Sequence, residues 1–93
     1  MIEEKVFEFG ERRRVTMAVW LNDGQAFTPA SPTYELTKIR EVVQSGVCEA
    51  TEDGGRWNLT AEVEPPGLGD YRLSFLFGLG NEKIRRSVRI KVI

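Results

Sequence analysis

The chain has 93 residues, a length that suits one domain, and we expect a single domain over residues 1–93. Hydrophobic residues make up 41% of the sequence and charged residues 29%, a balance typical of folded globular chains and not of disordered ones. The 13 basic and 14 acidic residues leave a formal net charge of −1, so no bulk field attracts nucleic acid or a membrane surface.

The N-terminal segment MIEEKVFEFGERRR has acidic residues where a signal peptide has basic ones, and it lacks the apolar stretch of such a peptide. No apolar run approaches the roughly 20 residues of a membrane-spanning helix. The single cysteine, Cys48, allows no disulfide within the chain, which favours a reducing compartment. We therefore expect a cytoplasmic protein with no membrane partner, carried elsewhere only as part of a larger assembly.

A hydrophobic period of two dominates the chain and predicts β-strands with one buried and one exposed face. Short segments rich in glycine, asparagine, aspartate and proline separate these runs and predict turns. The segment 37–43 also fits one turn of helix, although the pattern as a whole requires no helix. In chain order, we expect seven strands near residues 5–9, 13–21, 33–38, 43–51, 57–64, 70–77 and 83–93.

The apolar positions that share one face of each strand form the expected core. A large aromatic side chain contributes on the order of 2–3 kcal/mol when it is fully buried, so aromatic residues on that face are the natural anchors. In the segment 43–51, we expect Cys48 and Ala50 to point inward. The expected anchors of the structural core are Trp57, Tyr71, Leu73 and Phe75.

Seven short antiparallel strands in about 90 residues predict a two-sheet sandwich, although a small barrel has the same alternation. Tyr71 stands at the start of the sixth expected strand, after two prolines that stop the fifth strand and a turn over 67–70. Immunoglobulin-like and fibronectin-like sandwiches place a tyrosine at this corner, where its hydroxyl bonds to the upstream backbone. We therefore expect an all-β, immunoglobulin-like or fibronectin-like antiparallel β-sandwich of about seven strands, with no disulfide.

A set of short motifs runs through the last two thirds of the chain, in the order Y-x-L, V-x-S-G, G-G, L-x-A and G-x-Y-x-L-x-F. The residues that form them are Tyr34, Leu36, Val43, Ser45, Gly46, Gly54, Gly55, Leu59, Ala61, Gly69, Tyr71, Leu73 and Phe75. In these motifs and in its basic C-terminal strand, the chain resembles small immunoglobulin-like proteins encoded among the structural genes of phages and prophages. The resemblance implies a structural, virion-associated or assembly protein that acts through its surfaces, incorporated in a phage particle.

The sequence contains few candidates for catalytic residues. It has no histidine, the commonest general base and the commonest transition-metal ligand. Cys48 has no second thiol, and Glu62 with Glu64 fits a solvated strand face better than an acid–base pair. The segment 49–55 has oxygen ligands, but it lacks the alternating acids of a calcium loop. We expect no enzymatic activity, no cofactor and no metal.

Basic residues gather near the second strand and in the last one, and they would form one patch if those strands were neighbours. Such a patch would contact nucleic acid or an acidic protein. The alternative is cross-strand pairing with outward acids such as Glu62 and Glu64, which the overall charge balance favours, so nucleic acid is not the expected partner. The candidate basic patch consists of Arg12, Arg14, Arg85, Arg89 and Lys91.

Several apolar residues fall outside the expected core or at loop tips. If they cluster, they mark an interface with other proteins, virion components included, or with a second copy of the chain. A carbohydrate-binding module is the alternative, because an exposed tryptophan also stacks on sugars. The lack of a secretion signal favours the protein interface. The candidate interface residues are Trp20, Phe27, Leu76 and Leu79.

Overall fold

The computed structural model describes residues 3–21 and 25–93, and within these ranges it consists of strands, turns and loops without a helix. The expectation of an all-β chain is confirmed, but eight strands are present where seven were expected. In chain order they are β1 (Glu4–Phe7), β2 (Arg13–Val19), β3 (Ala30–Lys38), β4 (Glu41–Val47), β5 (Glu49–Asp53), β6 (Arg56–Val63), β7 (Gly69–Leu79) and β8 (Glu82–Val92).

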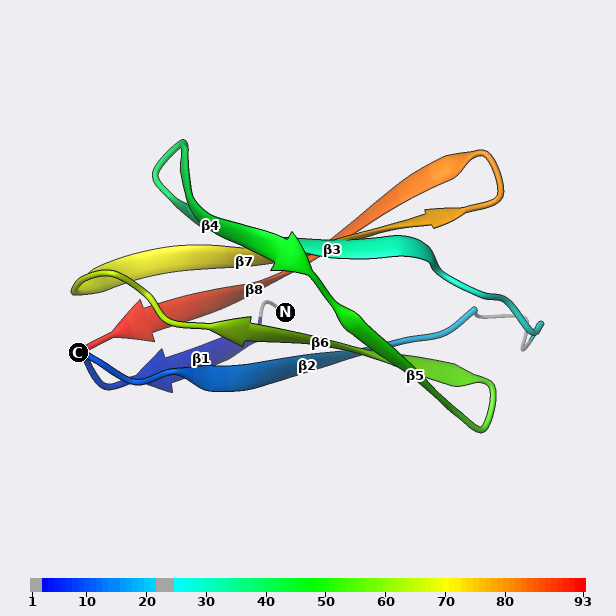
Figure 1. Ribbon diagram of the computed structural model, residues 1–93, viewed down its shortest axis with the longest axis horizontal. Coiled ribbons are helices and arrows are strands. Elements are labelled where there is room, and N and C mark those ends of the chain that lie inside the picture. The colour runs from blue at the N-terminus through cyan, green and yellow to red at the C-terminus, as the bar shows by residue number, and fades with distance from the viewer. Residues whose placement is uncertain (1–2, 22–24) are drawn as a thin grey trace.

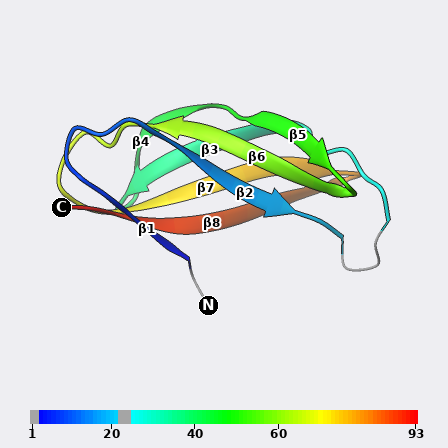
Figure 2. The same cartoon turned by 90° about the horizontal axis from the view of Figure 1, so that it is seen from below.

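The strands form two sheets that face each other (Figures 1 and 2). One sheet has five strands in the order β1-β8-β7-β3-β4, and the other has three in the order β2-β6-β5. Neighbouring strands are antiparallel except β1 and β8, which run parallel with Lys5 opposite Ile90. The expectation of a fully antiparallel sandwich is therefore wrong at β1, because the chain crosses to the other sheet between β1 and β2.

The core lies between the sheets and is built from alternate residues of both, as the period of two predicts. Tyr71, Leu73 and Phe75 are buried as expected. Trp57 is only half-buried, because it stands near the start of β6, and its Nε1 donates a hydrogen bond of 2.6 Å to the Phe27 carbonyl. The fully buried core side chains are Phe7, Leu36, Leu59, Val63, Leu73, Phe75 and Ile90.

The expected strand 43–51 is two strands, because the chain changes sheets at Cys48. β4 ends in the five-stranded sheet at Val47, and β5 begins in the three-stranded sheet at Glu49. The Cys48 amide donates to the Pro32 carbonyl at 3.0 Å, and its side chain is buried. Ala50 is exposed, contrary to expectation, since all of β5 lies on an exposed sheet edge.

The segment 37–43 is a hairpin between β3 and β4 and not a helical turn. Ile39 and Arg40 form the connection, and Ile39 has a φ of 60°, a conformation that a β-branched residue rarely adopts. The Ile39 side chain is exposed, so no core packing compensates for this backbone geometry. The paired strands on either side of the connection hold the turn in place.

Tyr71 fixes the connection between β6 and β7. Its Oη donates to the Gly67 carbonyl at 2.9 Å, so the expected hydroxyl-to-backbone bond is present, and its ring is buried. Lys38 closes the same corner, because its Nζ donates to the Leu68 carbonyl at 2.9 Å and lies 5.3 Å from the centroid of the tyrosine ring. These bonds satisfy two carbonyls that a turn would otherwise leave to water.

Candidate functional site

Three of the four predicted interface residues line one hollow of about 220 Å³. Trp20 follows the end of β2, Phe27 lies in the connection to β3, and Leu79 ends β7. They meet at the end of the molecule where the β7–β8 hairpin turns (Figure 1). Leu76 is half-buried on β7 and does not line the hollow, so the structure separates it from the other three.

Trp20 is the most exposed of these apolar side chains, with 53% of its surface accessible. The guanidinium carbon of Arg56 lies 4.9 Å from the centroid of its ring, a cation–π contact that covers one face of the indole. Phe27 is held by the hydrogen bond from Trp57, and Arg86 lines the hollow from β8. The hollow therefore combines aromatic and aliphatic walls with two guanidinium groups beside them.

The predicted basic patch is divided between the two sheets. Arg12 directly precedes β2 and Arg14 is near its start in the three-stranded sheet, whereas Arg85, Arg89 and Lys91 lie on β8 in the five-stranded sheet. The single stripe that the sequence suggested does not form, because β8 takes β1 and not β2 as its neighbour.

The two arginines near β2 are engaged with carboxylates. Arg12 Nε donates to Glu64 at 2.9 Å, and Arg14 pairs with Glu49. The hydrogen bond that Arg12 donates to Glu64, together with the charges of Glu64 and Glu62, raises the pKa of the Arg12 guanidinium above its usual range. This is the cross-strand pairing that the charge balance suggested, so these two residues are poor candidates for binding an external anion.

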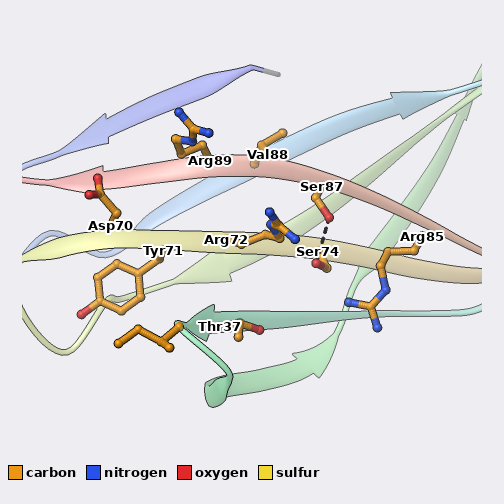
Figure 3. A pocket seen from close by; sticks show the side chains of 10 residues that line it. Thr37, Asp70, Tyr71, Arg72, Ser74, Arg85, Ser87, Val88 and Arg89 are labelled. Atoms are coloured by element: carbon orange, nitrogen blue, oxygen red, sulfur yellow. Dashed lines mark hydrogen bonds between the residues drawn. The ribbon is translucent and has the colours of Figure 1, made fainter. Parts of the chain in front are cut away.

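Arg85 and Arg89 of β8 border a hollow of about 600 Å³ on the outer face of the five-stranded sheet (Figure 3). We name this hollow the arginine groove and define it by Arg72, Ser74, Arg85, Ser87 and Arg89, which line it from β7 and β8. Arg72 was missed in the sequence because it is a single basic residue in an apolar strand. Counting back from the turn at Gly80 and Asn81 would have placed it opposite Arg89.

The described residues offer no assembled catalytic or metal centre. Within that part of the chain, no group of three or more histidine, cysteine, aspartate or glutamate side chains is placed to hold a metal ion. Burial raises the pKa of the Cys48 thiol to about 11, so it stays protonated at neutral pH and is a poor nucleophile. Nowhere in the described ranges is there a helix with the length and apolarity needed to cross a membrane.

No protein-family model and no curated protein matches the sequence. A crystal structure of an engineered protein from the Northeast Structural Genomics Consortium is similar in fold, with a TM-score of 0.62 and 15% sequence identity. The alignment covers 99% of this chain but 18% of that protein, so the chain spans less than a fifth of its length. At this identity the likeness concerns the fold alone: the chain has the all-β architecture of part of a larger engineered protein.

Proposed function

We propose that the chain is a non-enzymatic structural module that works by docking to other proteins. The observation that carries this proposal is the shared hollow of Trp20, Phe27 and Leu79 at one end of the molecule. Aromatic anchors grouped around a concavity are the side chains that dominate the energetics of protein interfaces. With Arg56 and Arg86 beside these anchors, the fitting partner surface presents an apolar side chain bordered by acidic groups.

We further propose that the two-sheet fold is immunoglobulin-like. The order β3-β7-β8 corresponds to strands C, F and G of that fold, and the order β2-β6-β5 corresponds to strands B, E and D. Tyr71 stands at the corner before the F-like strand and bonds to the backbone four residues upstream, like the tyrosine of such sandwiches. β1 departs from the standard order, because it pairs with β8 in parallel and not with β2.

The sequence resemblance to small immunoglobulin-like proteins of phages and prophages supports a particular setting. In that setting the protein is made in the cytoplasm and joins a virion or takes part in its assembly. Its partner is then a neighbouring virion protein or a second copy of the chain, docked at the Trp20 hollow.

Carbohydrate binding is the alternative function, and the half-exposed Trp20 is the observation that favours it. Arg56 weighs against it, because its guanidinium lies over the indole ring, whose faces a sugar would use for stacking. The protein-docking proposal needs no free indole face, since the edge of the ring and the walls of the hollow also provide apolar contact.

Sedimentation velocity on the chain alone, and mixed with the proteins encoded beside its gene, tests the proposal. We expect self-association or a mixed complex that Trp20→Ala weakens by about tenfold or more. Val42→Ala is the matched control, because Val42 is similarly exposed but lies on β4, outside the hollow. A chain that stays monomeric with every neighbour, yet binds a defined glycan on an array through Trp20, would overturn docking in favour of sugar binding.

A further inference from the structure

The outer face of the β7–β8 hairpin carries cross-strand pairs that alternate in size. Arg72 lies directly opposite Arg89, and one step along the same face Ser74 lies opposite Ser87. In the next step, Arg85 lies opposite Leu76. These side chains face outward because the residues between them, such as Leu73 and Phe75, fill the core. Short serines stand between long arginines along the arginine groove (Figure 3).

Arg72 and Arg89 form no salt bridge within the described part of the protein. Neither guanidinium has a carboxylate oxygen within 4.0 Å among the described residues, whereas Arg12 has two such partners and Arg13, Arg14 and Arg85 have one each. Like charges placed directly opposite each other destabilise an antiparallel strand pair. The hairpin therefore holds two positive charges together at a cost to its own stability.

Three acids lie around the groove without forming a salt bridge with Arg72 or Arg89. Asp70 is on the same face of β7, one step beyond Arg72, and Glu4 is the register partner of Arg89 on β1. Glu35 on β3 lies 3.8 Å from Arg85 and engages that arginine. The acids thus occupy the borders of the groove, and Arg72 and Arg89, which both line it, have no salt-bridge partner among the described residues.

The floor of the groove has a hydroxyl group ready to donate. The Oγ atoms of Ser74 and Ser87 are 2.9 Å apart, and their hydrogen bond uses one of the two hydroxyl protons. Ser74 is fully buried and Ser87 is half-buried. When the buried Ser74 donates to Ser87, the proton of Ser87 is free for a ligand in the groove.

We propose that the arginine groove binds the phosphoryl group of a phosphate monoester through Arg72, Arg89 and the Ser87 hydroxyl. A phosphate monoester carries close to two negative charges at neutral pH, which matches the two unpaired guanidinium groups. Its oxygens accept the paired N–H bonds of arginine, which are stronger than bonds between neutral groups. The site lies on the outer face of β7 and β8, away from the Trp20 hollow, and does not depend on the function proposed there.

A discrete phosphate fits the groove better than a nucleic-acid strand does. Single-stranded nucleic acids bind along extended basic tracks with aromatic side chains for their bases. Tyr71 is the aromatic residue among those that line the groove, and its ring is buried in the core with 4% of its surface exposed. Asp70 and Glu4 place negative charge at the Arg72–Arg89 end, where a continuing backbone would have to pass.

Nuclear magnetic resonance titration of the full ¹⁵N-labelled chain with inorganic phosphate, at constant ionic strength, tests the proposal. We expect saturable shifts at Arg72, Ser87 and Arg89, and a loss of affinity of about tenfold or more in Arg72→Gln and in Arg89→Gln. Arg14→Gln is the matched control, because it removes the same charge from an exposed strand position in the other sheet. The Arg14→Gln variant is expected to change the affinity by less than about twofold, because salt screens a distant exposed charge.

Two further ligands, a phosphoserine peptide and a DNA oligonucleotide, identify the source of the phosphate and test whether the groove prefers nucleic acid. Tighter binding of a phosphoserine peptide than of inorganic phosphate supports the proposal and identifies a phosphorylated protein as the source. Equal binding also supports it and identifies free phosphate. The proposal is overturned by non-saturable shifts, by an equal loss of affinity in Arg14→Gln, or by a DNA oligonucleotide without terminal phosphates that binds more tightly through Arg72 and Arg89.

Discussion

Cys48 shows how a single side chain couples the fold to pH. It lies where the chain leaves one sheet for the other, and only 5% of its surface is exposed. Burial raises the pKa of its thiol from 9.0 to about 11. Tyr34 is also buried, and its pKa is raised above 10.0, first by burial and then by the charges of Cys48 and Glu62.

The free energy of unfolding is expected to fall as the pH rises from about 9 towards 11. In this window the unfolded thiol has lost its proton and the folded thiol retains it, so rising pH favours the unfolded state. The stabilisation is fully present below the pKa of the unfolded thiol, and it is lost as the pH rises through the pKa of the folded thiol. A difference of two pKa units corresponds to on the order of 2–3 kcal/mol. Urea denaturation at a series of pH values measures it.

Cys48→Ala provides the control for this pH dependence. The variant is expected to flatten the profile between pH 9 and pH 10, while Tyr34 still lowers stability at higher pH with the same sign. If the variant and the original chain show the same pH dependence throughout, the thiol does not hold its proton as the burial implies.

At the scale of elements, the β7–β8 hairpin combines a well-packed inner face with a repulsive outer one. Its inner positions include Leu73, Phe75 and Ile90, which are fully buried. Its outer positions place Arg72 directly opposite Arg89. Strain of this kind persists in folded proteins where the rest of the structure compensates for it, and it is often found at functional sites.

Replacing Arg72 by threonine is expected to stabilise the protein. The change removes the repulsion from Arg89 and introduces a good strand former, which is worth about 0.2–1 kcal/mol at low ionic strength. Added salt should shrink the gain, because at about 1 M the Debye length falls to about 3 Å. Urea denaturation at low and high salt measures both effects.

Arg14→Thr is the matched control for this hairpin prediction, because Arg14 faces Glu49 and not another arginine. It should show no gain in stability at low salt. An Arg72→Thr variant that is less stable than the original chain at low salt would show that the repulsion is already relieved within the protein.

In the molecule as a whole, β1 forms one edge of the five-stranded sheet, next to the C-terminal strand β8. It pairs with β8 over four residues, and bonds of 2.9 Å from Phe9 to Ile93 and from Ile93 to Phe7 extend the contact. Phe7 is fully buried, so this short edge strand supplies a core side chain as well as backbone bonds.

Phe7→Ala is expected to lower the free energy of unfolding by about 3–5 kcal/mol, because it leaves a cavity between the sheets. Phe9→Ala is the matched control. Phe9 lies just beyond β1 with 62% of its surface exposed, and its loss should change stability by less than about 0.5 kcal/mol. Urea denaturation compares the two variants. Equal effects would mean that β1 adds no packing energy to the fold.

Much of the local structure could be predicted from the sequence, because strand alternation and turn chemistry are encoded in neighbouring residues. The inward face of β7 and the bonded corner at Tyr71 were both expected and are both present. The grouping of Trp20, Phe27 and Leu79 around one hollow does not follow from the sequence, since no local pattern relates residues so far apart in the chain. The groove at Arg72 and Ser87 was missed, because it depends on the register of a hairpin.

The pattern of residues along the chain is enough to predict an all-β fold, the position of most strands and most of the side chains that they bury. The pairing of β1 with β8, the change of sheets at Cys48 and the separation of Arg12 and Arg14 from Arg89 depend on how the strands pack in three dimensions. The reason is that strands pair through backbone hydrogen bonds, which are the same for every residue type except proline. The choice of neighbour therefore rests on how all the apolar faces pack at once, which no single segment encodes.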